Sequence, residues 1–188
     1  NVSPSGGMNL ETVEPIYLGK TTPDFTMGWN NNFTYKNFGL SFLINARVGG
    51  IVTSSTQALL DRFGVSKASA DARDAGGVMI PNQGLYDAKK YYTLVATGEN
   101  DLAGYYTYSA TNVRLQELTF SYKFNSRLFN NVIKDLTLSF VATNPWMIYC
   151  KAPFDPELTA STGTYGQGND YFMQPSLKSY GFSVKFKF

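Results

Sequence analysis

The sequence predicts an all-β protein, a segment of an antiparallel transmembrane β-barrel of about five strands with long loops. Three observations predict this fold class. Five runs alternate apolar and polar residues, which is the period of a strand with two different faces. The apolar face of each run lacks Lys, Arg, Asp and Glu, as a surface in contact with lipid requires. Long and short connections also alternate strictly between the runs.

The first two runs predict a hairpin. Residues 25–35 place aromatic side chains and a methionine on one face, and Thr, Gly and Asn on the other. Residues 38–48 continue this alternation. Only Lys36 and Asn37 separate the two runs, and so short a polar connection between alternating runs is typical of a β-hairpin.

The other three runs cover residues 117–124, 136–143 and 180–188, and the last alternates most regularly, ending on Phe188. Before the third run, Val113 and Leu115 have the opposite parity to Leu118, which predicts a bulge near Gln116 or a register change there. We expect one face to contact lipid, including Phe42, Phe120, Phe140, Phe182, Val184 and Phe186. We expect the other to face the barrel lumen, including Asn45, Thr119, Ser139, Ser183 and Lys185.

The connections differ greatly in length. Residues 49–110 form the longest, with one helical patch at residues 56–63, and residues 144–175 form a second long insertion. Residues 125–135 are a short connection with one amphipathic helical turn. Loops longer than about 15 residues are usually functional. The alternation places the long connections at one end of the sheet, so we expect them outside the cell and residues 125–135 in the periplasm.

Composition excludes several functions. The chain of 188 residues has no His and one Cys, Cys150, so it offers no His-based catalytic triad, no His-ligated metal and no internal disulfide. A net charge of +2 gives no electrostatic footprint for nucleic acid. No apolar run reaches the ~18 residues of a membrane helix, and the polar residues 1–7 are unlike a signal peptide. We therefore expect no enzyme activity, no cofactor and no dedicated metal site.

Five stretches, in this order along the chain, match the pattern of a known family. They are TPDFTMGWNNNFTYKNFGLSFLINARVGG (22–50), DARDAGGV (71–78), VRLQELTFSYKF (113–124), TNPWMIYCKAPFDPE (143–157) and SYGFSVKFKF (179–188). Together they resemble the C-terminal barrel portion of SusC/RagA-type TonB-dependent outer-membrane transporters. One departure is GKTTPDF at residues 19–25, where the family often has an Asn-Pro pair.

The resemblance implies a large outer-membrane barrel of a Gram-negative cell, multi-pass and of about 22 strands, with an N-terminal plug. It implies import of oligosaccharides or oligopeptides, energised by the TonB complex and assisted by a SusD-like surface lipoprotein. Nothing in the chain matches a plug or a TonB-interacting segment. We therefore expect residues 1–24 to end an extracellular loop and residues 25–188 to be C-terminal strands and loops, with the plug and earlier strands absent. The expected partners are the rest of the barrel, outer-membrane lipid, the lipoprotein, TonB through the missing N-terminal region, and the substrate.

Several loop residues are candidates for contact with the substrate or with the lid-like lipoprotein. An Asp-x-Arg-Asp cluster, Asp71, Arg73 and Asp74, could hold a polar ligand through charge-assisted hydrogen bonds or could pair internally and fix the loop. Tyrosines around Asn100 and Asp101 could stack on sugar or peptide, or could form an aromatic girdle or pack within the loop. These tyrosines are Tyr86, Tyr91, Tyr92, Tyr105 and Tyr106.

Asp155 and Glu157 are the best-placed pair of carboxylates for acid–base catalysis, since glycosidases need two carboxyl groups across a cleft. The interpretation that we favour is a structural loop contact. A third interpretation is a calcium site in which Asp155 and Glu157 converge with Asn169 and Asp170.

Two other functions stay open. A soluble β-sandwich that binds carbohydrate also alternates apolar and polar residues, and dependence on detergent separates it from a membrane protein. Another outer-membrane barrel, such as a porin, would lack the plug and the TonB-interacting segment of an importer.

Overall fold

The structure is a computed structural model that describes residues 14, 16–96, 103–125, 135–158 and 166–187. The chain divides into two units, each built from segments that are separate in the sequence. We call them the sheet unit, Thr22–Gly50, Ser109–Leu158 and Gln174–Phe188, and the helical unit, Asn1–Thr21, Ile51–Tyr108 and Thr159–Met173.

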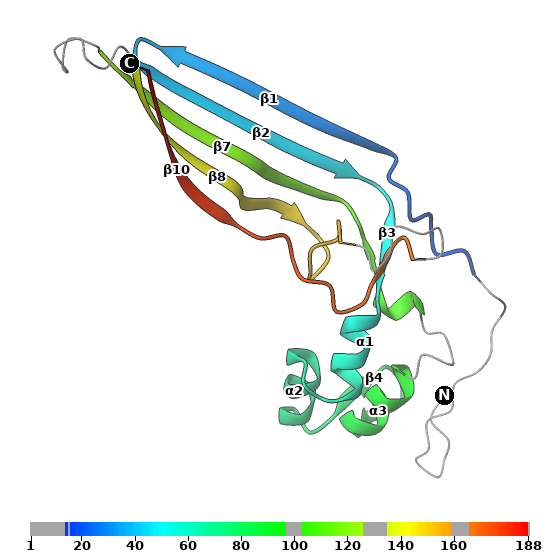
Figure 1. Cartoon of the computed structure of the whole chain (residues 1–188). Helices are drawn as coiled ribbons and strands as arrows, with labels where there is room; N and C mark the ends of the chain where they lie inside the picture. Colours follow the sequence, from blue (N-terminus) through cyan, green and yellow to red (C-terminus); the bar gives the residue numbers. More distant parts are fainter. Residues whose placement is uncertain (1–13, 15, 97–102, 126–134, 159–165, 188) are drawn as a thin grey trace. The chain divides into compact units, whose positions relative to one another are not determined.

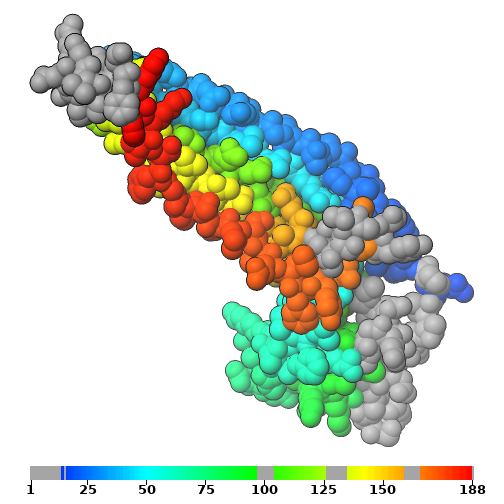
Figure 2. Space-filling model, in the orientation of Figure 1, coloured from blue at the N-terminus to red at the C-terminus, as the bar shows by residue number. Residues whose placement is uncertain are grey.

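The sheet unit contains one five-stranded antiparallel sheet, in the order β1-β2-β7-β8-β10 (Figure 1). The strands are β1 (Phe25–Tyr35), β2 (Phe38–Val48), β7 (Asn112–Phe124), β8 (Asp135–Cys150) and β10 (Ser179–Lys187). Each predicted run is therefore a strand, and the predicted fold class is confirmed. The sheet is open, because β1 and β10 each pair on one side only within the described residues. The space-filling view shows the strands side by side, from blue β1 to red β10 (Figure 2).

The predicted hairpin is confirmed. β1 and β2 pair from Phe25 opposite Val48 to Tyr35 opposite Phe38, so only two residues turn the chain. Lys36 takes a left-handed conformation, with φ of 50°, as a tight hairpin turn of this length requires. The side chain of Asn37 donates from Nδ2 to the carbonyl oxygen of Lys123 at 2.6 Å, which ties the turn to β7.

Strand pairing places the apolar residues of all five strands on one face. A single row across the sheet shows it, because directly paired residues share a face. The row runs Phe33, Leu40, Phe120, Phe140 and Phe182. Over the described residues of the five strands, this apolar face carries no Lys, Arg, Asp or Glu. The next row on the opposite face, Ser41, Thr119 and Val141 with Gly181, is small or polar apart from the valine.

Asn31 is a polar exception on the apolar face. Asn31 lies opposite Phe42, and the ring of Phe42 contacts Trp29 and Phe33 at centroid distances of 5.8 and 6.1 Å. The Nδ2 atom of Asn31 is buried and has no hydrogen-bond partner among the described residues. The two faces of the sheet thus differ as predicted in charge, although not completely in polarity.

The predicted bulge is confirmed at Gln116. Glu117 pairs with Leu43 and Leu115 pairs with Ile44, so Gln116 has no partner on β2. One extra residue in β7 reverses the parity of the residues before it. Val113 and Leu115 consequently lie on the same apolar face as Leu118.

The predicted end of the fourth strand at Thr143 is wrong. β8 continues to Cys150, so the second long connection begins at residue 151 and not at residue 144. The pairing with β7 skips Asn144 and Pro145, and Asn144 has a φ of 49°. This irregularity accommodates a proline, which has no N–H for the ladder. After it the strand resumes with Trp146 opposite Leu115.

The helical unit is built from short elements of the two long connections. Its helices are α1 (Ser55–Arg62), α2 (Lys67–Asp74), α3 (Ala88–Val95) and the 3₁₀ helix η1 (Ala103–Tyr106). The predicted helical patch at residues 56–63 is confirmed as α1, whereas α2 and α3 were not predicted. Two small sheets accompany them, with the orders β6-β3-β9 and β4-β5. Their strands are β3 (Ile51–Ser54), β4 (Val78–Ile80), β5 (Gly84–Tyr86), β6 (Thr107–Ser109) and β9 (Asn169–Asp170).

Side-chain caps explain where these helices begin. Ser54, Ser66 and Asp87 each accept a hydrogen bond from a backbone N–H in the first turn of α1, α2 and α3 respectively. Val95, Ala96 and Tyr106 form the buried core of the unit, against which Ala58 packs. No helix among the described residues is long and apolar enough to cross a membrane.

Candidate ligand-contact residues in the loops

Four tyrosines of the helical unit, Tyr92, Tyr105, Tyr106 and Tyr108, lie near a buried carboxylate that sequence reasoning missed. Asp61 on α1 is 3% exposed. Its Oδ2 accepts a hydrogen bond from the hydroxyl of Tyr106 at 3.1 Å, and its Oδ1 accepts one from Nε2 of Gln57 at 3.0 Å. A buried carboxylate is tolerated only when it is hydrogen-bonded. Asp61 therefore fixes η1 against α1.

Burial of the Tyr106 hydroxyl, and next the nearby carboxylate of Asp61, raise the pKa of Tyr106 far above its ordinary value. Tyr106 is therefore protonated at every physiological pH, and its hydrogen bond to Asp61 is kept. The sequence around Asp61 gives no local signal of this contact, because its partner Tyr106 lies 45 residues away.

The predicted tyrosines divide into buried and accessible ones. Tyr92 is 7% and Tyr106 is 4% exposed, so both contribute mainly to the core. Tyr105 is 49% exposed, and Tyr86 and Tyr91 are half-buried. The rings of Tyr91 and Tyr92 meet edge to face at 5.2 Å, and those of Tyr105 and Tyr106 at 4.9 Å. Burial and the neighbouring Tyr91 raise the pKa of Tyr105, so this exposed ring keeps its hydroxyl proton.

Asp71, Arg73 and Asp74 all lie on α2 and are exposed. Nη1 of Arg73 donates to the carbonyl oxygen of Gly64 at 2.7 Å, which holds the turn between α1 and α2. This contact matches the interpretation in which the cluster fixes the loop, and it leaves the other Arg73 nitrogens for a ligand. Asn100 and Asp101 lie outside the described residues. Ligand contact by the whole set stays a prediction.

Residues 169–172 are bound to the start of α1. Oγ of Ser54 donates to Oδ2 of Asp170 at 2.6 Å, and Oγ of Ser55 donates to Oδ1 of Asn169 at 3.0 Å. β9 pairs in parallel with β3 at the same point. Asp170 and Asn169 thus use their oxygens within the helical unit, and the described residues hold no group of three or more His, Cys, Asp or Glu that suits a metal ion. The calcium interpretation stays a hypothesis.

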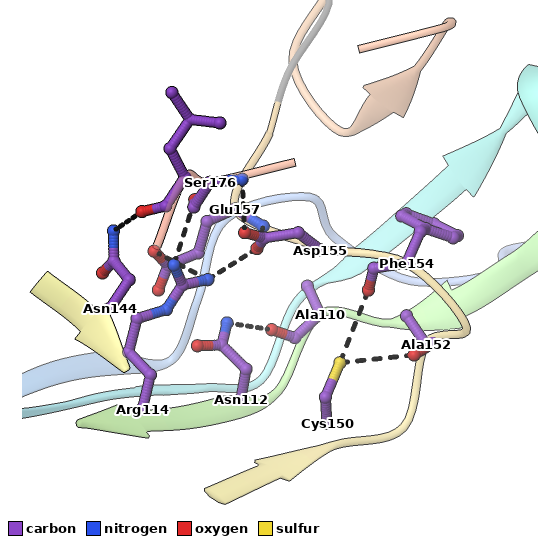
Figure 3. Close-up of polar contacts among 11 residues, drawn as sticks. Ala110, Asn112, Arg114, Asn144, Cys150, Ala152, Phe154, Asp155, Glu157 and Ser176 are labelled. Carbon is purple, nitrogen blue, oxygen red and sulfur yellow. Dashed lines mark hydrogen bonds and ion pairs between the residues drawn. The ribbon is translucent and has the colours of Figure 1, made fainter. Parts of the chain in front are cut away.

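In the sheet unit, Arg114 of β7 joins two separate loop segments (Figure 3). Its Nη2 lies 2.5 Å from Oδ1 of Asp155 and 3.3 Å from Oε2 of Glu157. Its Nη1 donates to Oγ of Ser176 at 3.1 Å. The side chains of Arg114 and Asp155 are only 5% and 8% exposed. This buried cluster ties the loop after β8 and the segment before β10 to the sheet.

The cluster favours one of the two interpretations of the carboxylates. Burial raises the pKa of Asp155, but hydrogen bonds from Ser176 and Arg114 together outweigh it and lower the pKa below its ordinary value. A general acid needs a raised pKa, which Asp155 lacks. Both carboxylates also face one guanidinium group and not each other across a cleft. The geometry is that of a structural loop contact. The thiol of Cys150 donates to the carbonyl oxygens of Ala152 and Phe154 (Figure 3).

Comparison with known proteins places this geometry in context. No protein-family model matches the chain. The TonB-dependent receptor P3 of Formosa agariphila is 26% identical over 189 residues, which cover 97% of this chain and 18% of that protein. Structures of the RagAB peptide importer share the fold. In the open-open state the TM-score is 0.64 and the identity 18%. The match covers 89% of this chain and 17% of that chain. In the closed-closed state the TM-score is 0.62 and the identity 15%. The match covers 98% of this chain and 20% of that chain.

The resemblance to SusC/RagA-type transporters is confirmed. The SusC/RagA-like chain spans less than a fifth of the length of the curated relative that it matches. An open five-stranded sheet is what a part of such a barrel would form.

Proposed function

We propose that this chain forms part of the barrel of a TonB-dependent importer in the outer membrane of a Gram-negative cell. The importer takes up oligopeptides or oligosaccharides and works with a SusD-like surface lipoprotein. One observation carries this proposal: an exposed apolar face without charge that extends across all five strands of the sheet unit.

The size and exposure of that face support a membrane protein. Phe182, Phe33 and Phe120 lie in one continuous row across the sheet. They are 86%, 56% and 45% exposed, respectively. Soluble proteins rarely expose so large an apolar surface. The strands have 9 to 16 residues, and about 9–11 tilted residues are enough to cross the apolar core of a bilayer. A soluble sandwich would bury this apolar face, whereas its aromatic residues are exposed.

The relatives support the finer parts of the proposal. A TonB-dependent receptor covers nearly the whole chain, which supports energised import. The RagAB neighbours import peptides, which supports oligopeptides as one substrate class. In this proposal the helical unit lies outside the cell and offers Tyr105, Asp71 and Asp74 to the substrate or to the lipoprotein.

Uptake by living cells tests this proposal. The full-length protein that contains this chain would be compared with its deletion in the same strain, using fluorescent oligopeptides and oligosaccharides of defined length. We expect uptake that requires the protein and stops when the proton gradient is collapsed or TonB is deleted. Uptake that persists without TonB would identify a passive porin, and a protein recovered in the soluble fraction would favour the carbohydrate-binding module.

A further inference from the structure

The helical unit contains a pocket of about 150 Å³, and Asp61, Gly64 and Arg73, whose contacts are described above, belong to its lining. It lies between the end of α1, the turn that follows, α2 and α3. Arg62 and Phe63 come from α1 and its cap, Arg73 from α2, and Lys89 and Tyr92 from α3. Drug-sized ligands fill pockets of about 300–1,000 Å³, so this pocket fits one terminal group and not a whole oligomer.

The lining is cationic. Three of the lining residues, Arg62, Arg73 and Lys89, carry positive charge. Asp61 is the one carboxylate of the lining over the described residues, and its two oxygens already accept hydrogen bonds from Gln57 and Tyr106. The arrangement therefore favours an incoming anion, which can form charge-assisted hydrogen bonds with the free donors.

One of these cations is held in position by the backbone. Nη1 of Arg73 donates to the carbonyl oxygen of Gly64, so the guanidinium group is fixed at the pocket before any ligand arrives. Gly64 has a φ of +72°, and a Cβ atom there would lie 2.7 Å from Nη1 of Arg73. Glycine at this position therefore permits both the turn and the close approach of Arg73.

The pocket also has an apolar border. The side chain of Phe63 is 73% exposed beside the cations. An aromatic ring next to fixed positive charges suits a ligand whose anionic group adjoins an apolar or sugar surface. Tyr92, which is 7% exposed, is a second aromatic residue of the lining.

We propose that this pocket binds a terminal oxyanion, a carboxylate or a sulfate ester, of the imported oligomer. Arg73 and Lys89 donate charge-assisted hydrogen bonds to the oxyanion, Arg62 adds positive charge, and Phe63 contacts the neighbouring unit of the oligomer. The assignment of the anion to an imported oligomer rests on the proposed function. The preference of the pocket for an anion rests only on its lining.

Calorimetric binding to the purified full-length protein in detergent tests the site directly. Four probes separate the two sources of the anion: acetyl-tetraalanine and its C-terminal amide, and N-acetylglucosamine 6-sulfate and N-acetylglucosamine. We expect at least one anionic probe to bind about tenfold more tightly than its neutral partner, the ratio that one charged hydrogen bond of about 1.4 kcal/mol supplies. The peptide pair identifies a carboxylate and the sugar pair a sulfate ester.

Two neighbouring lysines of α3 give a matched pair of variants. Lys89 lines the pocket and Lys90 does not, and both side chains are exposed, so neither substitution disturbs the core. We expect Lys89→Gln to weaken binding of the anionic probe about tenfold and Lys90→Gln to leave it unchanged. Equal weakening by both variants, equal binding of anionic and neutral probes, or no binding of any probe at millimolar concentration would overturn the proposal.

Uptake measured in parallel keeps the two proposals apart. If the anionic probe binds and Lys89→Gln weakens it, but cells show no energised uptake, the site stands and the proposed importer is wrong. If uptake is energised but the probes bind without regard to charge, the importer stands and the anion site is wrong.

Discussion

The charged residues of this chain differ sharply in their surroundings, and these differences predict how much each ion pair stabilises the fold. Arg114 and Asp155 form a buried pair, with side chains 5% and 8% exposed. Lys123 and Asp135 form a pair at 2.9 Å whose side chains are 61% and 48% exposed. Removing one partner of a buried pair leaves an uncompensated charge, whereas water replaces the partner of an exposed one.

We therefore predict that Asp155→Asn destabilises the full-length protein by about 3 kcal/mol, near the low end for a broken buried pair because Glu157 still faces Arg114. Lys123→Gln, the matched control, should change the stability much less, because water screens and replaces this exposed pair. Urea unfolding in lipid vesicles measures both. Equal effects of the two variants would show that the cluster around Arg114 does not hold the loops.

The same cluster predicts a dependence on pH. The pKa of Asp155 in the folded protein lies below its ordinary value of 3.8. The stability that Asp155 supplies is therefore complete above about pH 4 and is lost as the pH falls through the lowered folded pKa. We expect protease cleavage of residues 151–158 to increase below pH 4 in the wild type. In Asp155→Asn the cleavage should already be high at pH 7 and should not respond to Asp155 titration.

Among the elements, the two faces of the sheet carry the membrane argument. Phe140 pairs with Phe120 and Phe182, whereas its neighbour Ser139 pairs with Ser121 and Ser183 on the other face. Arginine on a lipid face costs about 2–4 kcal/mol near the middle of the bilayer, while a lumen position tolerates it. Phe140→Arg should thus reduce the yield of protein folded into lipid vesicles, and Ser139→Arg should not. Equal yields would favour a soluble sheet.

The connections make a second prediction about elements. All the described helices lie in the connection between β2 and β7, and the loop after β8 begins at residue 151. If these connections are extracellular, protease added to intact cells should cut within residues 49–110 and 151–175 of the full-length protein. The connection at residues 125–135 should be cut only after the outer membrane is opened. Cleavage of that connection in intact cells would reverse the proposed orientation.

The elements also show what the sequence could predict and why the rest escaped. Alternation identified every strand of the large sheet, and the parity change at Gln116 located a real bulge. The same rules failed at Asn144 and Pro145, which are typical of a turn but lie inside β8. The pairing with β7 skips these two residues, and such an irregularity can be recognised only when the partner strand is known. α2, with the sequence KASADARD, has no large apolar residue that would show a helical face, and the available signals for α2 and α3 were the capping residues Ser66 and Asp87.

The candidate site was less predictable than the fold. The sequence identified a tyrosine-rich loop but not which rings are buried, since burial of Tyr106 depends on Asp61, 45 residues away. Likewise, Arg114 binds carboxylates 41 and 43 residues further along the chain. Contacts at such separations depend on how the loops return to the sheet, and no local pattern encodes them.

At the scale of the whole molecule, the open sheet predicts how the chain behaves alone. β1 and β10 each leave one row of backbone N–H and C=O groups without a sheet partner among the described residues. Lipid offers no hydrogen bonds to such groups, and each unpaired group in lipid destabilises the protein by several kcal/mol. In water, a long apolar edge strand promotes aggregation. Neither environment therefore suits the sheet until further strands close it.

We predict that residues 1–188, expressed alone, give no monodisperse water-soluble protein, whereas the full-length protein folds into lipid as a barrel that unfolds on heating in SDS gels. Size-exclusion chromatography and circular dichroism with and without detergent measure the first part. The exposed aromatic face, on which Phe182 is 86% exposed, is the reason that we expect detergent to solubilise the chain. We expect no cooperative thermal transition in detergent, because the edges of the described sheet stay unpaired. A soluble monomer with a cooperative thermal transition would mean that the apolar face is covered within this chain, and the carbohydrate-binding sandwich would then replace the importer.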